Sequence, residues 1–335
     1  MIFSCPSCRG PLDREGKGVA CSACGNEYPR VGPILDLRLP GPSWIDYEAD
    51  RAKARHLLAL GPEATAETLV RTVFGRRPGW TDEHVERRTR QALDAVDRLR
   101  DELRDWLAPF LSSEGPLVDL GCGAGQLVAA AAGLGQNVIG LDVSLEWLVV
   151  ADRMVQERGA HPTLVAALAE SLPFGNGTVS TVLSLDVIEH VGDQPAYLRE
   201  IARVLRPGGS AVFTTPNRFS LAAEPHVGVW GVGWLPRKWQ ARYVASRTSL
   251  AYEFVRLLGA GEIRRLVRRE TDLAVSIRIP PIPAADLRRF GVRRRALARF
   301  YNLLSGSALT RWVFHAVGPF FRVIARKPVG AGATR

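Results

Sequence analysis

Short apolar runs alternate with longer amphipathic stretches through the middle of the chain. The runs before Gly121, at 137–144 and at 179–185 have the length and composition of buried strands. Between them lie segments with helical periodicity, one of which ends at a Pro-Gly-Gly stop. We therefore expect strands and helices to alternate in an α/β fold. The residues that share one face of this last helix are Leu198, Ile201, Ala202 and Leu205.

The strand pattern resumes at 273–280 and 320–328, with 320–328 expected to close the sheet antiparallel. Residues 281–318 between them predict a helical insertion before the last strand. This block combines arginines with Leu, Phe, Tyr and Trp, so it could form an interfacial helix that meets anionic lipid. We favour a cap whose apolar face packs on the substrate pocket, because such helices usually pack inward in globular folds.

Residues 41–112, which precede the strand before Gly121, also have a helical pattern. Apolar residues recur there at spacings of three and four, which indicates an amphipathic stripe. We expect a helical lid over the ligand site. The stripe consists of Ala92, Val96, Leu99, Leu103 and Leu107.

Composition narrows the class of protein without selecting a partner. The 335 residues are 46% hydrophobic, enough for a full core. No apolar run approaches the roughly 20 residues of a membrane span, and MIFSCPSCRG lacks the apolar block of a secretory signal, so we expect a cytoplasmic protein. The net charge of +10 permits nucleic acid, anionic membrane or acidic substrates as partners. The charge is concentrated in residues 256–335, which hold 17 Lys and Arg against four Asp and Glu.

Two C-x-x-C pairs stand at the start of the chain. Cys5 and Cys8 precede Cys21 and Cys24 by a glycine-rich stretch long enough for a hairpin. Four thiolates at this spacing predict a zinc ribbon over 1–40. The metal would be structural, because protein ligands would occupy all four of its coordination positions. A disulfide pairing is the alternative, and a reducing compartment disfavours it.

The stretch VDLGCGAGQ at 118–126 combines a strand end, a glycine turn and a helix start. Such a turn suits either a dinucleotide or S-adenosylmethionine, because backbone N–H groups converge there. Asp119 would repel a pyrophosphate but could pair with an ammonium group, which favours a zwitterionic amino-acid ligand. Asp142, at the end of the next strand, is placed to accept from ribose hydroxyls.

The order V-D-L-G-C-G-x-G, G-x-D-x-S, A-E-x-L-P-F, D-V-I-E-H and L-R-P-G-G over residues 116–217 resembles the class I S-adenosylmethionine-dependent methyltransferases. The resemblance implies a Rossmann-like seven-stranded sheet over 113–330, with 217–260 and 281–318 as substrate-side insertions. Residues 5–37 resemble the short zinc-binding domain of partners of RNA and protein methyltransferases. Leu168 departs from the family pattern, which often has Asp there.

The resemblance assigns parts of the cofactor to particular residues. Asp119 and the glycine turn would hold the methionine moiety, and Asp142 would hold the ribose. Val143 would pack against the adenine, and Ala169 and Glu170 would lie along its edge. The expected cofactor-binding residues are Asp119, Gly121, Gly123, Gly125, Asp142, Val143, Ala169, Glu170 and Asp186.

His190 follows the fourth strand in D-V-I-E-H, at the sheet edge where ligands of open α/β folds bind. A histidine there can act as a general base on an acceptor hydroxyl, or it can pack or cap without taking a proton. His226 is a second candidate base, in a segment rich in Gly, Pro and Trp. The T-P-N sequence at 215–217 resembles that of many small-molecule and lipid O-methyltransferases of this class. Enzymes that methylate an exocyclic or amide nitrogen carry N-P-P-Y or D-P-P-Y instead, which argues against amino methylation of adenine, cytosine or glutamine.

The leading hypothesis is therefore an O-methyltransferase acting on a small-molecule, glycan or lipid-linked acceptor, with peripheral membrane contact open. The alternative is an RNA methyltransferase that grips phosphates through the zinc ribbon and the basic C-terminal quarter. A non-catalytic scaffold is a third class, disfavoured by the intact glycine turn and Asp142.

Overall fold

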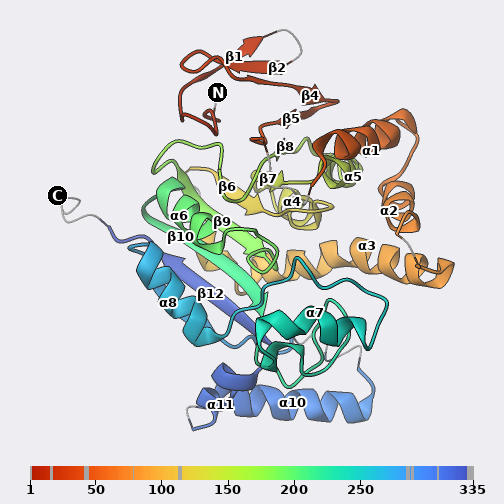
Figure 1. Cartoon of the computed structure of the whole chain (residues 1–335), viewed down its shortest axis with the longest axis vertical. Helices are drawn as coiled ribbons and strands as arrows, with labels where there is room; N and C mark the ends of the chain where they lie inside the picture. The colour runs from red at the N-terminus through yellow and green to blue at the C-terminus, as the bar shows by residue number, and fades with distance from the viewer. Residues whose placement is uncertain are drawn as a thin grey trace.

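A nine-stranded sheet forms the centre of the protein (Figure 1). The structure is a computed structural model that describes residues 2–15, 18–40, 45–77, 79–111, 115–283, 287, 290–307 and 309–329. The strand order is β11-β12-β10-β9-β6-β7-β8-β5-β4. The five central strands run parallel, and β12 lies antiparallel between β10 and β11, as predicted. Their bounds are β6 (Leu117–Leu120), β7 (Val138–Asp142), β8 (Thr163–Ala166), β9 (Val179–Leu185), β10 (Leu205–Pro216), β11 (Ala274–Arg278) and β12 (Phe320–Arg326).

Two further strands extend the expected seven-stranded sheet at one edge. β5 (Ile34–Asp36) pairs in parallel with β8, and β4 (Arg30–Val31) pairs antiparallel with β5. Both belong to the segment that the sequence assigned to the zinc ribbon. The end of this segment is thus a structural part of the main sheet.

The rest of the N-terminal segment is a separate three-stranded sheet, β1 (Leu12–Glu15), β2 (Gly18–Cys21) and β3 (Glu27–Tyr28). It is joined to the main body by polar contacts. The backbone N–H of Ser4 donates to Pro173 O at 3.0 Å, and the Arg9 guanidinium pairs with Glu200 at 3.1 Å. These contacts attach the ribbon to α6 (Gln194–Val204) and the loop before β9.

Helices cover both faces of the sheet. α1 (Tyr47–Ala59) and α2 (Ala66–Gly75) pack on α5 (Leu145–Gln156), and α3 (Asp82–Arg104) packs on α4 (Gln126–Ala132). The predicted stripe is buried in the core at Val96 and Leu103 on α3 and at Leu107, just beyond the end of this helix. These helices lie in the layer that covers the sheet, and Arg77, just after α2, lines the first cavity described below. Whether this segment acts as a lid stays a prediction.

The opposite face carries α6 and α8 (Ala260–Glu270), which contact each other. α6 ends at Val204, and Leu205 begins β10, although it is buried with the predicted apolar face. α7 (Arg237–Ala245) and the short 3-10 helix η2 (Val232–Trp234) belong to the segment after β10, and η1 (Ala108–Phe110) follows α3.

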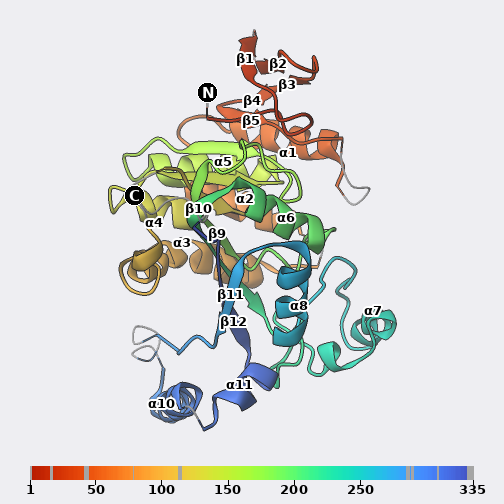
Figure 2. The ribbon, with the colours of Figure 1, turned by 90° about the vertical axis from the view of Figure 1, so that its left-hand side faces the viewer.

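The predicted insertion between β11 and β12 contains α10 (Val292–Gly306) and α11 (Arg311–Val317). Figures 1 and 2 place these helices at the end of the molecule opposite the three-stranded sheet. The expectation that their apolar face packs inward is wrong, because most large apolar side chains of α10 are exposed, namely Val292, Leu297, Phe300 and Leu303. Across the described residues no helix has the length and apolar character needed to cross a membrane.

Candidate active site

The glycine turn joins β6 to α4 at the carboxyl edge of the parallel strands. Gly121, Gly123 and Gly125 all have positive φ, at 78°, 51° and 75°. A Cβ on Gly121 would lie 2.3 Å from Val187 Cγ2, so that glycine is needed for close packing, whereas a Cβ on Gly123 would meet no atom within 4 Å. The turn therefore combines tightly packed backbone with one open position.

A cavity of about 580 Å³ opens beside this turn. Of the nine expected cofactor-binding residues, seven line it: Gly121, Gly123, Asp142, Val143, Ala169, Glu170 and Asp186. Gly125 lies outside the lining and instead allows α4 to approach α5, since its Cβ would lie 2.6 Å from Ala151 Cβ. Asp119 is also outside the lining and is buried behind the turn.

Two carboxylates lie side by side under the glycine turn. Asp142 accepts from the N–H groups of Gly123 at 2.8 Å and Ser144 at 2.9 Å, which fixes its orientation. Burial raises the pKa of Asp142 in spite of these bonds. Burial and the neighbouring Asp142 raise the pKa of Asp119 to about 8. Asp142 on the cavity wall, with Asp119 buried outside the lining, thus gives this end a negative character that a cationic or hydroxyl-bearing ligand would stabilise.

The other end of the cavity is mainly apolar. Glu170 has a structural task there, since its Oε1 accepts from Gly192 N–H at 2.9 Å and Asp193 N–H at 3.3 Å. Sequence reasoning missed part of this wall, because Trp147 on α5 and Arg77 after α2 carry no motif. The lining residues not expected from the sequence as cofactor contacts are Arg77, Leu120, Ser144, Trp147, Ala167, Leu168, Val187, Val191 and Phe254.

Asp186 stands at the end of β9 with a strained backbone, its φ being 56°. Its Oδ1 accepts from Thr214 Oγ1 at 2.8 Å, and burial raises its pKa. Asp186 lines both the first cavity and a second one of about 370 Å³. The second cavity is bounded by α3 and by Pro280 and Phe320, on either side of the helical insertion.

His190 lines the first cavity, and its ring meets that of His226 edge to face at 4.8 Å. Burial and His226 lower the pKa of His190. Burial opposes protonation of His226, but its hydrogen bond with the buried Glu224 outweighs this and raises its pKa. The pair therefore holds a neutral imidazole next to one that is readily protonated.

Glu189 lies beneath the two histidines. Its Oε2 accepts from Thr215 Oγ1 at 2.9 Å, and its Oε1 has no hydrogen-bond partner within the described part of the chain. Possible metal-ligand atoms of Glu189, His190 and His226 lie within 4.8 Å of one another, close enough to contact one divalent cation. The adjacency of His226 to His190 could not be read from the sequence, where 35 positions separate them.

The comparison with protein families matches residues 118–213 to a methyltransferase domain. A ubiquinone biosynthesis O-methyltransferase of Maricaulis maris is 31% identical over 240 residues, which cover 69% of this chain and 80% of the relative. The chain belongs to the class I S-adenosylmethionine-dependent methyltransferases. The strand order and the glycine turn agree with this membership.

Other relatives are matched over shorter stretches. A ubiquinone biosynthesis O-methyltransferase of Parvibaculum lavamentivorans is 34% identical over 126 residues, 36% of this chain and 48% of the relative. This chain thus spans about half the length of that protein. Among solved structures, phosphoethanolamine N-methyltransferase 2 of Haemonchus contortus in complex with S-adenosyl-L-methionine has a TM-score of 0.46 at 18% identity, covering 77% of this chain and 60% of that one.

The residues of the first cavity fit the cofactor of these methyltransferases. Asp119 is buried next to the lining, and burial and Asp142 raise its pKa; an ammonium group such as that of S-adenosylmethionine would stabilise its carboxylate. Gly123 leaves room at the turn for a ligand to approach the backbone. The apolar wall with Val143 and Trp147 suits a flat aromatic base.

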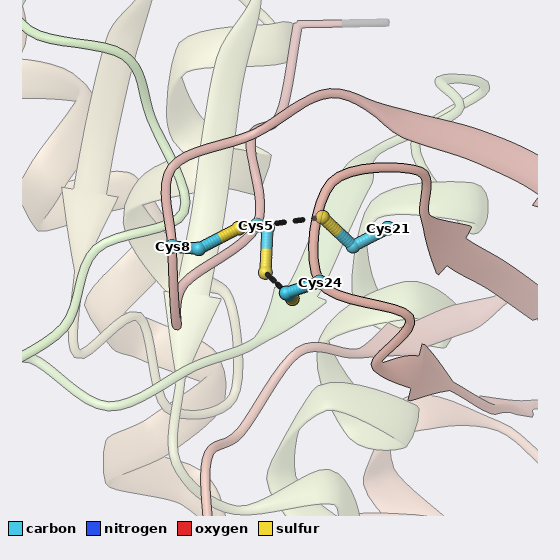
Figure 3. Close-up of side chains that lie close together, drawn as sticks. All are labelled: Cys5, Cys8, Cys21 and Cys24. Carbon is cyan, nitrogen blue, oxygen red and sulfur yellow. Dashed lines mark hydrogen bonds between the residues drawn. The ribbon is translucent and has the colours of Figure 1, made fainter.

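The four N-terminal cysteines point toward one another in two loops of the three-stranded sheet (Figure 3). Cys5 Sγ lies 3.7 Å from Cys24 Sγ, and Cys8 Sγ lies 3.4 Å from Cys21 Sγ. All four sulfurs lie within 4.8 Å of one another. Burial opposes ionisation of Cys5, but hydrogen bonds from Tyr28 and the backbone lower its pKa to about 6. This set of four thiols could hold a tetrahedral metal ion.

Proposed function

We propose that this methyltransferase transfers a methyl group to a hydroxyl of a small, lipid-like acceptor. Relatives that bear the name ubiquinone biosynthesis O-methyltransferase support an oxygen acceptor on an apolar molecule. The observation that carries the proposal is that His190 lines the cofactor cavity together with Asp186, and that Asp186 also lines a second, partly apolar cavity.

The cofactor would be held by the residues of the first cavity. Asp119 would pair with its ammonium group, Asp142 would accept from the ribose, and Val143 would pack on the adenine. When bound, S-adenosylmethionine supplies an electrophilic methyl group on a sulfonium. The protein's task is then to align an acceptor oxygen with that methyl group and to exclude water.

His190 would take the proton of the acceptor hydroxyl. Its lowered pKa keeps the imidazole neutral near physiological pH, which is the form that accepts a proton. Glu224 keeps His226 oriented through their hydrogen bond, and a protonated His226 would hold His190 neutral by repulsion. The acceptor oxygen would take the methyl group as the bond between the methyl carbon and the sulfonium sulfur breaks, leaving S-adenosylhomocysteine, and the proton of the hydroxyl would pass to the His190 ring.

The second cavity would bind the body of the acceptor. Leu99, Pro280 and Phe320 give it apolar walls, and Arg98 and Arg322 give it positive charge. Because Asp186 borders both cavities, an acceptor there lies next to the cofactor. These walls favour an aromatic or prenylated hydroxyl compound over a glycan, whose many hydroxyls need polar partners.

The experiment is a kinetic comparison of wild type with His190→Ala, using phenolic and catecholic acceptors with and without a prenyl chain. We expect kcat to fall by about 10² to 10⁴ in the variant, with the Kd for S-adenosylhomocysteine unchanged. His161→Ala is the matched control, since this exposed histidine lies outside both cavities. An unaltered kcat in His190→Ala would remove His190 from the chemistry.

The RNA alternative is tested in the same assay by offering RNA as acceptor. The relatives do not favour it. Methylation of RNA with a steep loss of affinity at high salt, and no turnover of phenolic acceptors, would reverse the proposal.

We also propose that the four N-terminal cysteines bind a structural Zn²⁺. The closeness of the four sulfurs supports this, and a site with four thiolates leaves no open position for catalysis.

A further inference from the structure

The helical insertion turns its apolar side chains away from the protein. On α10, Val292 is 83% exposed, Leu297 69% and Leu303 70%. Within this helix only Ala298 and Ser305 are buried. An exposed apolar helix face of this kind marks an interaction site in a soluble domain.

Polar groups occupy the side of α10 that contacts the protein. Asn302 exchanges two hydrogen bonds with the backbone of Ile282, at 2.7 and 2.9 Å, and the Tyr301 hydroxyl donates to Pro280 O at 3.2 Å. The orientation of the helix is thus fixed by specific bonds that hold its apolar face outward. At 100° per residue, Val292, Phe300 and Leu303 fall on one side of the helix.

The apolar face continues beyond α10. Leu309 is 84% exposed, and Trp312 on α11 is 70% exposed. The rings of Tyr301 and Phe314 meet edge to face at 5.2 Å, which ties α11 to α10. Both helices therefore expose apolar side chains. They lie at the end of the molecule opposite the three-stranded sheet (Figure 2).

Positive charge surrounds this surface without acidic neighbours in sequence. Arg293, Arg294, Arg299 and Arg311 are exposed, and no ion pair involves them among the residues that the structure describes. Residues 287–335 contain no Asp or Glu. A basic rim around aliphatic and aromatic side chains complements an anionic lipid surface, where the apolar groups enter the acyl boundary and the arginines meet the headgroups.

We infer that α10 and α11 form a docking surface for an anionic lipid bilayer. The partner that we expect to bind this surface is the membrane interface. The surface is convex, arginines border its apolar side chains, and no other described element covers it. The inference holds independently of which acceptor the enzyme methylates. If the acceptor is lipid-like, docking would also bring the bilayer close to the second cavity, since Pro280 and Phe320 flank the insertion.

Co-sedimentation of the full-length protein with vesicles tests this inference. We expect binding to vesicles of phosphatidylcholine mixed with phosphatidylglycerol, weak binding to phosphatidylcholine alone, and release at high salt. The triple variant R293A, R294A, R299A should lose about a hundredfold in partition coefficient, at about tenfold for each 1.4 kcal/mol and roughly 1 kcal/mol for each arginine. The matched control is R55A, R87A, R90A, which removes three exposed arginines from α1 and α3 and should bind as wild type.

A second variant tests the apolar component. Phe300→Glu with Leu303→Glu places charge on exposed positions, so the fold should persist, as checked by the melting temperature and S-adenosylhomocysteine affinity. Loss of vesicle binding in this variant supports the inference. Absence of binding by wild type to anionic vesicles, or equal losses in both arginine triples, overturns it. A wild-type dimer that the Glu variant converts to monomer would assign the surface to a second copy of the chain and would also overturn it.

Discussion

The Arg38 guanidinium donates through Nη1 to Asp50 Oδ2 at 2.6 Å, in a buried ion pair that connects the end of the zinc-ribbon segment to the cofactor cavity. The same Nη1 donates to Val143 O at 2.8 Å, and Asp50 accepts from the Leu145 N–H at 2.9 Å. Asp36, on β5, completes the pairing of the guanidinium. The loop after β7, which carries the expected adenine contact, is therefore held in place by Arg38 and Asp50, from the N-terminal part of the chain.

Substitution of Arg38 by Ala should weaken both stability and cofactor binding. It leaves the buried Asp50 without its cation and Asp36 paired with Arg51 alone, at a cost of about 3–5 kcal/mol. We expect the Kd for S-adenosylhomocysteine to rise by about tenfold or more under conditions where the variant is folded, because Val143 loses its anchor. Urea denaturation and calorimetric titration measure the two effects. Arg55→Ala on α1, an exposed site, serves as control, and equal affinity in Arg38→Ala would show that the loop keeps its position unaided.

Cofactor binding should release a proton from Asp119. The ligand-free carboxyl has a pKa of about 8 and so carries a proton near pH 7, whereas an ammonium partner favours the carboxylate. Affinity for S-adenosylhomocysteine should therefore rise by up to about tenfold per pH unit toward pH 8 and then level off. Titration in buffers of different ionisation enthalpy measures the proton directly. Asp119→Asn should bind weakly and without this proton, and equal proton release from it would assign the proton to another group.

Three glycine substitutions separate packing from ligand contact. Gly121→Ala should be strongly destabilising, because its φ is positive and its Cβ would lie 2.3 Å from Val187. Gly135→Ala has a positive φ but no neighbour within 4 Å, so it should cost only the roughly 1–2 kcal/mol of a left-handed residue. Gly123→Ala should resemble Gly135→Ala in stability and lose cofactor affinity, since it lines the cavity. Thermal denaturation ranks the three, and full affinity in Gly123→Ala would contradict its assignment.

Zinc analysis tests the N-terminal site. Purified protein should contain about one zinc ion per chain, and strong chelators should release it with loss of hydrogen-exchange protection in β1 to β3. Cys8→Ser should reduce the zinc content, whereas Cys122→Ser should retain it, because Cys122 lies buried in the glycine turn outside the cluster. Zinc-free protein with an unchanged exchange pattern would refute the structural role.

The parts of the molecule that follow local rules could be predicted from the sequence. The strand ends that carry Asp142 and Asp186, and the glycine turn, follow from apolar runs and the chemistry of the turn. The pairing of β5 with β8 could not be predicted, because a strand of three residues has no sequence pattern that identifies a partner some 130 positions away. The outward orientation of the apolar face of α10 was not the favoured prediction. Periodicity shows that a helix is amphipathic, but it does not show which face of the helix contacts the rest of the protein.

The pairing of β5 with β8 sets an order of events during synthesis. Leu35 pairs with Val165 and Asp36 with Ala166, so the edge of the sheet cannot be completed until that later strand has left the ribosome. Loop closure over this distance is slow compared with local folding. The three-stranded sheet with the four cysteines can form early, whereas β5 keeps unpaired backbone groups until β8 has been synthesised. That interval is when the nascent chain is most exposed to aggregation through its free edge.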